Sequence, residues 1–227
     1  MPLAFAHRGD WSAAPENTVA AFQAAERAGA DVIELDIRCT SDDAVVVVHD
    51  PTLERIWGST AAVADSTLAD VSSLRVDGHR VATLAEALAS TSVPFMVDYT
   101  DADVVEPALE VIRAAGAFDR VVFSGGNVEG HRLIRSRVPR ARIALTWTDE
   151  TPPSSELLEE LDVEYFNPPW QHIDPGVVGA MHERGYKVST WTVDDVAEMR
   201  RVIDAGADAV ITNRIGELVS LLVETTC

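Results

Sequence analysis

The sequence predicts a closed (β/α)8 barrel, eight parallel strands each followed by a helix, with a small insertion after the second strand. The chain has 227 residues, which suits one barrel of this kind. Short apolar runs alternate with stretches in which apolar residues recur three and four positions apart, as expected for strands alternating with helices. Such an alternation indicates a parallel sheet, and eight units close it into a barrel. We therefore expect a single domain over residues 1–227.

Nine short apolar runs are the candidate strands. They are Leu3–Ala6, Val32–Ile37, Val45–Val48, Phe95–Val97, Val121–Phe123, Ile143–Leu145, Glu164–Phe166, Val188–Trp191 and Ala209–Ile211. Helix-like stretches lie between most of them. The clearest are Glu16–Ala28, Val104–Ala115, Val128–Arg137, Gly176–Arg184 and Val196–Ala205. Several of these end at or near a glycine, as helix C-termini commonly do.

One of the nine runs exceeds what the barrel needs. No helix separates Val45–Val48 from Val32–Ile37, so these two runs are expected to form a hairpin. A two-residue loop at Asp42 and Asp43 would place Asp36 opposite His49, at the carboxyl end of the second barrel strand. Residues 50–80, helical only over Leu68–Leu74, are then expected to form an insertion beside the site.

The composition limits the classes of partner. A formal net charge of −19 disfavours nucleic acid and anionic membrane surfaces, which would repel the protein. No apolar run is long enough to span a bilayer, so stable membrane insertion is not expected. The absence of a secretory signal and the presence of only two cysteines, Cys39 and Cys227, favour a cytoplasmic protein. Lys187 is the only lysine, so phosphate chemistry here would depend on arginine, histidine and a metal ion.

Polar residues gather where the first three barrel strands end, which is where barrel enzymes act. They are His7, Arg8, Glu34, Asp36, His49 and Asp98. Glu34 and Asp36 stand two residues apart and therefore on one face of their strand. Charges within apolar strands are costly unless they are paired or bound to metal. Three carboxylates without a lysine indicate a divalent cation bound through oxygen, an ion-paired structural network being the alternative.

Four segments resemble the signature of the glycerophosphodiester phosphodiesterase family, which belongs to the TIM-barrel superfamily of phosphatidylinositol phosphodiesterases. The segments are His7-Arg8-Gly9, Pro15-Glu16-Asn17-Thr18, Glu34-Leu35-Asp36 and His49-Asp50-Pro51-Thr52-Leu53-Glu54-Arg55. Further along, Thr83–Leu88, Trp191–Asp194 and Ile211–Asn213 are also similar to the family. The resemblance thus covers nearly the whole chain, and its first fifty residues are the most specific.

The resemblance implies a metal-dependent hydrolase that converts glycerophosphodiesters to sn-glycerol 3-phosphate and an alcohol, with Mg2+ or Ca2+. Glu34, Asp36 and Asp98 would be its metal ligands, and His7 and His49 its acid–base or nucleophile pair. For the substrate, Arg8 would clamp a phosphate oxygen, Glu16 would orient His7 or Arg8, and Trp191 would wall the pocket. Asn17 is a candidate cap of the first helix. Attack by water and attack by a neighbouring substrate hydroxyl both stay open.

The sequence departs from the family at one strand end. Family members usually carry Glu-x-Lys where this chain has Asp98-Tyr99-Thr100. Asp98 can still bind a hard cation, but Thr100 cannot supply a lysine charge. Lys187 cannot replace it either, because it precedes Trp191 by four residues and belongs to the opposite end of its strand. Two alternatives therefore stand beside the main hypothesis: a lysophospholipid or other phosphodiester substrate, and a catalytically silent barrel.

Several rim residues are weaker candidates for the site. Ser124, Trp147 and Asn167 end or follow strands, and His172 lies just beyond Asn167. The remaining three histidines are expected to be ordinary surface or helix residues: His79, His131 and His182.

Overall fold

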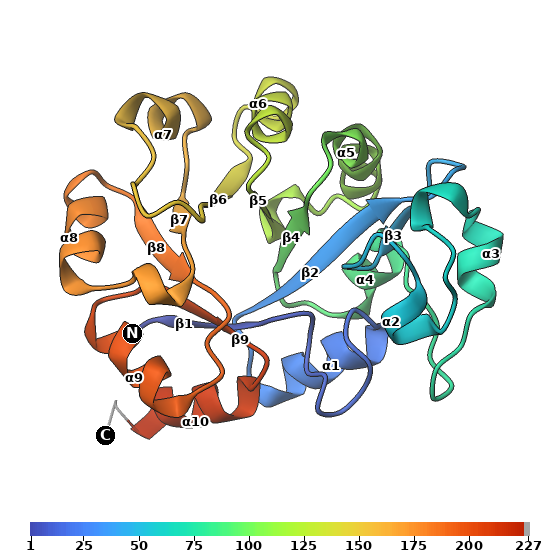
Figure 1. Cartoon of the computed structure of the whole chain (residues 1–227), viewed down its shortest axis with the longest axis horizontal. Coiled ribbons are helices and arrows are strands. Elements are labelled where there is room, and N and C mark those ends of the chain that lie inside the picture. Colours follow the sequence, from blue (N-terminus) through green and yellow to red (C-terminus); the bar gives the residue numbers. More distant parts are fainter. Residues whose placement is uncertain (225–227) are drawn as a thin grey trace.

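The computed structural model describes residues 1–224 and has the predicted barrel, with strands at the centre and helices around them (Figure 1). All nine predicted apolar runs form strands. Their bounds are β1 Leu3–Ala6, β2 Val32–Cys39, β3 Val45–Val47, β4 Phe95–Tyr99, β5 Val121–Gly125, β6 Arg142–Thr146, β7 Tyr165–Asn167, β8 Lys187–Thr190 and β9 Ala209–Thr212. Cys227, one of the two cysteines, lies outside the described residues.

Eight of these strands close into a parallel barrel. Neighbours follow the order β1, β9, β8, β7, β6, β5, β4, β2, and a β1–β2 pairing closes the ring. The β2–β4 register places Asp36 beside Asp98. The expected hairpin joins β3 to β2 in antiparallel orientation, so β3 stands outside the ring.

Helices of seven to ten residues cover the outside of the barrel. They are α1 Val19–Ala28, α4 Leu84–Ser90, α5 Val105–Ala114, α6 Val128–Arg137, α7 Ser155–Leu161, α8 Pro175–Glu183, α9 Val196–Asp204 and α10 Ile215–Glu224. Of these, α4, α7 and α10 were not among the predicted helices. Short 3-10 turns η2 Ala102–Val104, η3 Phe118–Arg120 and η4 Trp170–His172 lie in the connections. Within residues 1–224, no helix has the length and apolar character needed to cross a membrane.

Two apolar layers explain the strand pattern. One lies between the strands and the helices and includes Leu35, Val97 and Phe123. The other fills the barrel interior with Phe5, Val32, Met96, Val122, Ala144, Tyr165, Ala209 and Ile211. Successive strand residues point to opposite faces, so the residue two positions after an interior apolar one also points inward. The interior therefore changes from apolar to polar toward the carboxyl ends of the strands.

The hairpin loop is one residue longer than predicted. The pairs are Ile37 with Val47 and Cys39 with Val45, so Asp36 lies opposite residue 48 and not opposite His49. The expected two-residue loop was wrong because Thr40 begins a turn, its carbonyl accepting from the Asp43 amide at 3.1 Å. Asp43 then takes a left-handed conformation, with φ of 59°, which makes a three-residue hairpin loop.

The segment between β3 and α4 forms the expected insertion. It contains α2 Glu54–Trp57, the 3-10 turn η1 Val63–Asp65 and α3 Leu68–Ser73, and it projects beside β3 (Figure 1). Its apolar side chains are buried against Val46 of β3 and against Val48, which follows that strand. They are Leu53, Trp57, Val63 and Val71. This separate small core fixes the insertion, and with it Asp50 and Arg55, at the edge of the barrel.

The first helix starts later than predicted. It begins at Val19, and Thr18 is its N-cap, with the Thr18 hydroxyl accepting from the Ala21 amide. The expectation that Asn17 caps this helix was wrong. Asn17 has a φ of 58° and is buried, and its side chain bonds to Asp36 instead. A site contact, not the helix, therefore determines how Asn17 is placed.

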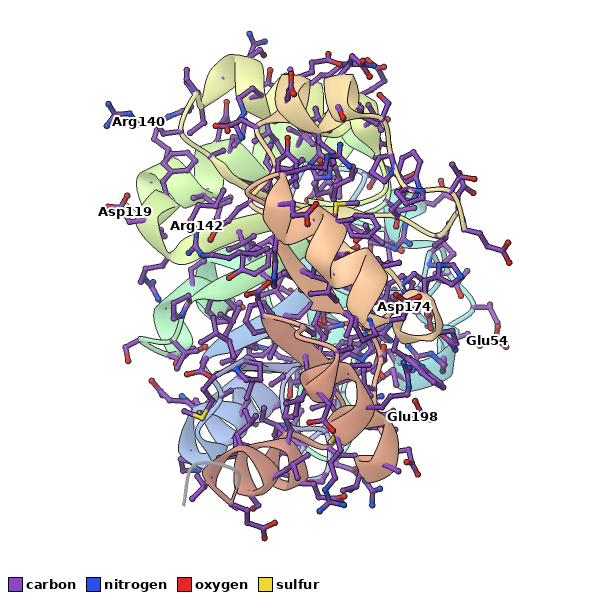
Figure 2. The ribbon with its side chains drawn as sticks, turned by 90° about the vertical axis from the view of Figure 1, so that its left-hand side faces the viewer. Glu54, Asp119, Arg140, Arg142, Asp174 and Glu198 are labelled. Carbon is purple, nitrogen blue, oxygen red and sulfur yellow. The ribbon has the colours of Figure 1, made fainter. Side chains whose placement is uncertain are left out.

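The two ends of the barrel are separate in side view (Figure 2). Asp119 and Arg140 precede β5 and β6, and they lie on one side of the molecule. Glu54, Asp174 and Glu198 follow β3, β7 and β8, and they lie on the other side. The second side is the carboxyl end of the strands, where the polar residues of the sequence gather.

Candidate active site

A cavity of about 170 Å³ opens at the carboxyl ends of the strands. All six residues predicted to converge there line it: His7, Arg8, Glu34, Asp36, His49 and Asp98. Trp191 also lines it, as do three neutral polar residues from β5, β6 and β7, namely Ser124, Thr146 and Asn167. Met96 and Ile211 of the interior apolar layer are the remaining lining residues.

A tight turn presents the residues at the end of β1. Arg8 and Gly9 both have positive φ, 59° and 84°. A side chain on Gly9 would place its Cβ 2.8 Å from the backbone of Ala21 in α1. Only glycine permits this close approach to the helix. The His7-Arg8-Gly9 sequence thus turns the chain sharply after His7, leaving the His7 and Arg8 side chains at the cavity.

His7 is held by a chain of two further residues. Its Nδ1 lies 2.7 Å from Oδ1 of Asn213, and Nδ2 of Asn213 donates to Asp194 at 2.7 Å. Because an amide oxygen only accepts, Nδ1 of His7 carries the hydrogen and Nε2 keeps its lone pair. Burial lowers the pKa of His7, and the nearby Arg8 charge lowers it further. Neither Asn213 nor Asp194 had been assigned a role from the sequence, although Asn213 directly follows β9 and Asp194 lies four residues after the end of β8.

Arg8 is surrounded by carboxylates. Its Nη1 donates to Glu16 at 2.9 Å, its Nε lies 3.2 Å from Oδ2 of Asp36, and its main-chain amide donates to Glu34 at 2.9 Å. Glu16 was expected to orient either His7 or Arg8, and its contact is with Arg8. The Arg8 Nε atom is buried without a well-formed hydrogen bond. A guanidinium in this state retains capacity for an anionic oxygen.

Three carboxylates stand close together on β2 and β4. Burial raises the pKa of Glu34 well above its ordinary value, and the charges of Asp36 and Asp98 raise it further. Burial and Asp36 likewise raise the pKa of Asp98 to about 7. Within residues 1–224, no three His, Cys, Asp or Glu side chains already stand in a metal-binding arrangement. The carboxylates supply suitable oxygen donors, and Asp36 is turned toward Asn17 and Arg8.

His49 lines the cavity from the segment that follows β3 and is tied to the insertion. Its Nδ1 lies 2.7 Å from Oδ1 of Asp50, and Asp50 in turn accepts from Arg55 at 2.6 Å. Arg55 also donates to Glu16 at 2.7 Å, and so connects Asp50 to the carboxylate that holds Arg8. The hydrogen bond from Arg55 lowers the pKa of Asp50 to about 2. Arg38 of β2 donates to the His49 carbonyl at 2.8 Å.

The other half of the cavity is neutral. Thr146 accepts from Asn167 Nδ2 at 3.0 Å and lies 3.3 Å from the Ser124 hydroxyl, and Ser189 donates to Asn167 Oδ1 at 2.8 Å. Trp191 donates its indole N–H to the Asn167 carbonyl at 3.0 Å. Ser124 and Asn167 were predicted as weaker candidates. Two residues were not predicted: Thr146, which lines the cavity, and Ser189, which supports Asn167 from behind the lining. Their inward positions on β6 and β8 were the signal.

Other weak candidates lie away from this cavity or do not line it. Trp147 donates its indole N–H to the Thr151 carbonyl at 2.8 Å, and His172 has a buried Nδ1 without a partner among the described residues. Lys187 pairs with Glu164 at 3.0 Å. It is the first residue of β8 and therefore lies away from the cavity, as expected. Thr100 is exposed at the end of β4.

His131 lies in helix α6, one of the two places expected for it, but it is not an ordinary helix residue. It is fully buried, with Nε2 2.9 Å from the Gly125 carbonyl and Nδ1 2.8 Å from the Tyr99 hydroxyl. Its helix α6 turns this side chain onto the barrel, where the end of β4 supplies a partner. His182, in contrast, is an exposed residue paired with Asp208, as expected for a surface histidine.

Comparison with known proteins identifies the family. The profile of the "Glycerophosphoryl diester phosphodiesterase family" matches residues 7–217. A glycerophosphodiester phosphodiesterase of Caldanaerobacter subterraneus is 30% identical, with 97% of each chain covered. A probable glycerophosphodiester phosphodiesterase 2 of Mycobacterium tuberculosis is 31% identical over 97% of this chain and 90% of its own.

Solved structures agree on the fold. A phosphodiesterase of Oleispira antarctica, solved in complex with the product sn-glycerol-3-phosphate, superimposes with a TM-score of 0.92 at 22% identity and covers 98% of this chain and 97% of its own. A putative glycerophosphoryl diester phosphodiesterase of Silicibacter pomeroyi gives 0.90 at 20% identity, covering 100% and 94%. From the profile match and the two sequence relatives, the chain belongs to the glycerophosphoryl diester phosphodiesterase family of enzymes.

Proposed function

We propose that this chain hydrolyses glycerophosphodiesters to sn-glycerol 3-phosphate and an alcohol, with His7 and His49 as its acid–base pair and a divalent cation, Mg2+ or Ca2+, as cofactor. The observation that carries the proposal is the cavity itself. Two histidines, one arginine and three carboxylates line it together, in a member of this enzyme family. The product bound to the Oleispira antarctica relative has the size and charge that such a cavity would accept.

His7 is suited to be the general base. Asn213 holds its Nδ1–H, so Nε2 presents a lone pair, and burial lowers its pKa and keeps it neutral at physiological pH. In this scheme Nε2 takes the proton from the attacking water while the new oxygen–phosphorus bond forms; if a neighbouring substrate hydroxyl attacks instead, water then opens the cyclic phosphate. Asn213 and Asp194 then stabilise the charged ring, as the buried partners of catalytic histidines commonly do.

His49 is suited to be the general acid. The hydrogen bond from Arg55 keeps Asp50 ionised, with a pKa of about 2, and Asp50 lies 2.7 Å from Nδ1 of His49. A carboxylate in this position stabilises an imidazolium. As the phosphorus–oxygen bond to the alcohol breaks, His49 would give its Nε2 proton to the departing oxygen. One turnover with direct water attack leaves His7 protonated and His49 neutral, and proton exchange with solvent restores both.

The charge of the diester requires compensation. Arg8 lines the cavity, and its guanidinium would bind one non-bridging oxygen. A cation held by Glu34, Asp36 and Asp98 would neutralise the other and stabilise the transition state. The donor set fits such an ion, because burial and mutual repulsion raise the pKa values of Glu34 and Asp98, and a bound cation relieves both effects.

The test is release of sn-glycerol 3-phosphate from glycerophosphocholine, measured with Mg2+, with Ca2+ and after treatment with a chelator. We expect release with at least one cation and its loss on chelation. A parallel assay of metal binding by the wild type and by Glu34→Gln separates the two halves of the proposal. Full activity after complete metal removal would contradict the cation, and no release from a metal-loaded protein would contradict the substrate.

A further inference from the structure

The neutral half of the cavity has no step of its own in the proposed chemistry, although Ser124 hydrogen-bonds Asp98 of the charged half. Four successive strands contribute one uncharged polar side chain each: Ser124 from β5, Thr146 from β6, Asn167 from β7 and Ser189 from β8. Hydrogen-bonding contacts of 2.8–3.3 Å connect them in this order. Ser124, Asn167 and Ser189 are almost completely buried, at 0%, 2% and 0% exposure, while Thr146 is half-buried. We call these four residues the neutral ladder.

The neutral ladder has hydrogen-bonding capacity to spare. A threonine hydroxyl has one donor and two acceptor sites, and an amide nitrogen has two hydrogens. Asn167 gives one of its two amide hydrogens to Thr146. Among residues 1–224, the Thr146 hydroxyl has one further contact, with the Ser124 hydroxyl at 3.3 Å. Thr146 and Asn167 both line the cavity. Buried polar groups of this kind are stable in a ligand site when the ligand completes their bonds.

The chemistry of the neutral ladder selects its ligand. It has no charge for a phosphate, and its donors and acceptors match those of aliphatic hydroxyls. Trp191, anchored to the Asn167 carbonyl at 3.0 Å, lines the cavity on the same side, and its ring can cover a short hydrocarbon backbone. A cavity of about 170 Å³ is smaller than pockets for drug-sized ligands. A polyol of a few carbon atoms fits these conditions.

We propose that the neutral ladder binds the glycerol hydroxyls of the substrate, with Thr146 and Asn167 making the direct hydrogen bonds and Ser124 and Ser189 orienting them. This inference rests on the proposed function, because it assigns the glycerol part of that substrate to one half of the cavity and the phosphate to the other. It makes Thr146 and Asn167 specificity-determining residues. The histidines, Arg8 and the carboxylates then act on the phosphate. The neutral ladder determines which group attached to that phosphate the cavity binds.

The test uses binding, so it does not depend on turnover. Calorimetry gives the affinities of wild type and Thr146→Val for sn-glycerol 3-phosphate, for 3-hydroxypropyl phosphate, which lacks the 2-hydroxyl, and for 2-hydroxypropyl phosphate, which lacks the 1-hydroxyl. Inorganic phosphate serves as the probe of the charged half. Thr190→Val is the matched control, because Thr190 is fully buried in β8 and bonds the Pro168 carbonyl without lining the cavity.

We expect the wild type to bind sn-glycerol 3-phosphate more tightly than at least one analogue, by roughly three- to tenfold for one hydrogen bond. Thr146→Val should lose most of that discrimination and keep its affinity for inorganic phosphate, while Thr190→Val keeps both. A Thr146→Val protein that discriminates like the wild type would overturn the inference, as would equal weakening for all four ligands. If the wild type discriminates between these ligands but releases no sn-glycerol 3-phosphate from glycerophosphocholine, the proposed hydrolysis is contradicted and the binding inference is not.

Discussion

The Nδ1 atom of His7 lies 2.7 Å from the side-chain oxygen of Asn213, 206 positions later in the chain. This contact joins the first and last strands of the barrel, which pair along β1 and β9. It also settles which nitrogen of His7 faces the cavity. The tautomer of the proposed base therefore depends on a residue at the far end of the sequence.

Replacing Asn213 by alanine should lower kcat and shift its pH dependence. Burial and the Arg8 charge lower the pKa of His7, and the hydrogen bond that its Nδ1–H donates to Asn213 opposes them by raising it. Without this hydrogen bond the pKa falls further, so the acid limb of the pH–rate profile should move to lower pH. At neutral pH we expect at least a tenfold loss of kcat, because the ring is no longer held. An unchanged acid limb in Asn213→Ala would show that another group titrates there.

Replacing Arg55 by alanine should reduce kcat while the fold persists. Arg55 is half-exposed but holds both Asp50 and Glu16, so its loss frees the partner of His49. The pKa of Asp50 should rise from about 2 toward its ordinary value. We expect a loss of several-fold, smaller than that of His49→Ala. Arg75→Ala is the control, since Arg75 lies in the same insertion and bonds only main-chain carbonyls; equal rates in the two variants would exclude the insertion from catalysis.

Replacing Thr100 by lysine should tighten phosphate binding. Thr100 follows Asp98 by two residues and so lies on the same side of the strand as the cavity-lining carboxylate. A partly exposed charge there is worth up to about 1 kcal/mol, or roughly fivefold in affinity. Thr91→Lys, which adds the same charge before β4 at the other end of the barrel, controls for net charge. Inhibition by sn-glycerol 3-phosphate gives the affinities, and equal changes in both variants would argue against a role for position 100.

His131 should make the protein sensitive to mild acid. Burial lowers its pKa to about 4, whereas the unfolded chain titrates near the ordinary value of about 6.5. Between these values the unfolded state binds the extra proton, so stability is complete above pH 6.5 and falls as the pH drops toward 4. The contribution is on the order of 3 kcal/mol. Urea denaturation of wild type and His131→Gln at pH 7 and pH 5 should give a shallower pH dependence for the variant.

Much of the fold could be predicted because the barrel repeats one local pattern. Each strand is a short apolar run, and α6 was predicted with its observed bounds, Val128–Arg137. Helices α4 and α7, which were not predicted, have only seven residues each, which gives little periodicity to detect. The hairpin register was wrong by one residue because a left-handed Asp43 lengthens the loop. That conformation is not visible in the residue type alone.

The charged residues of the site were predictable because they stand at the ends of strands that a barrel brings together, whereas their supporting contacts were not. His7, Glu34 and Asp36 stand at strand ends, so the barrel itself explains why they meet. Three supporting residues needed the tertiary structure. Asn213 reaches the site because the ring closes, and Arg55 because the insertion folds beside the barrel. Thr146 reaches it because alternate residues of β6 point inward. His131 shows the reverse case, since only the packing of α6 against Tyr99 distinguishes it from a surface histidine.

The most direct test of the central claim is the rate of sn-glycerol 3-phosphate release from glycerophosphocholine by wild type, His7→Ala and His49→Ala at saturating Mg2+ or Ca2+. Acid–base catalysis contributes roughly 10²- to 10⁴-fold, so each variant should lose that much of kcat and still bind sn-glycerol 3-phosphate. His182→Ala, at the other end of the barrel, should retain the wild-type rate. Full hydrolysis by either His7→Ala or His49→Ala would contradict the account.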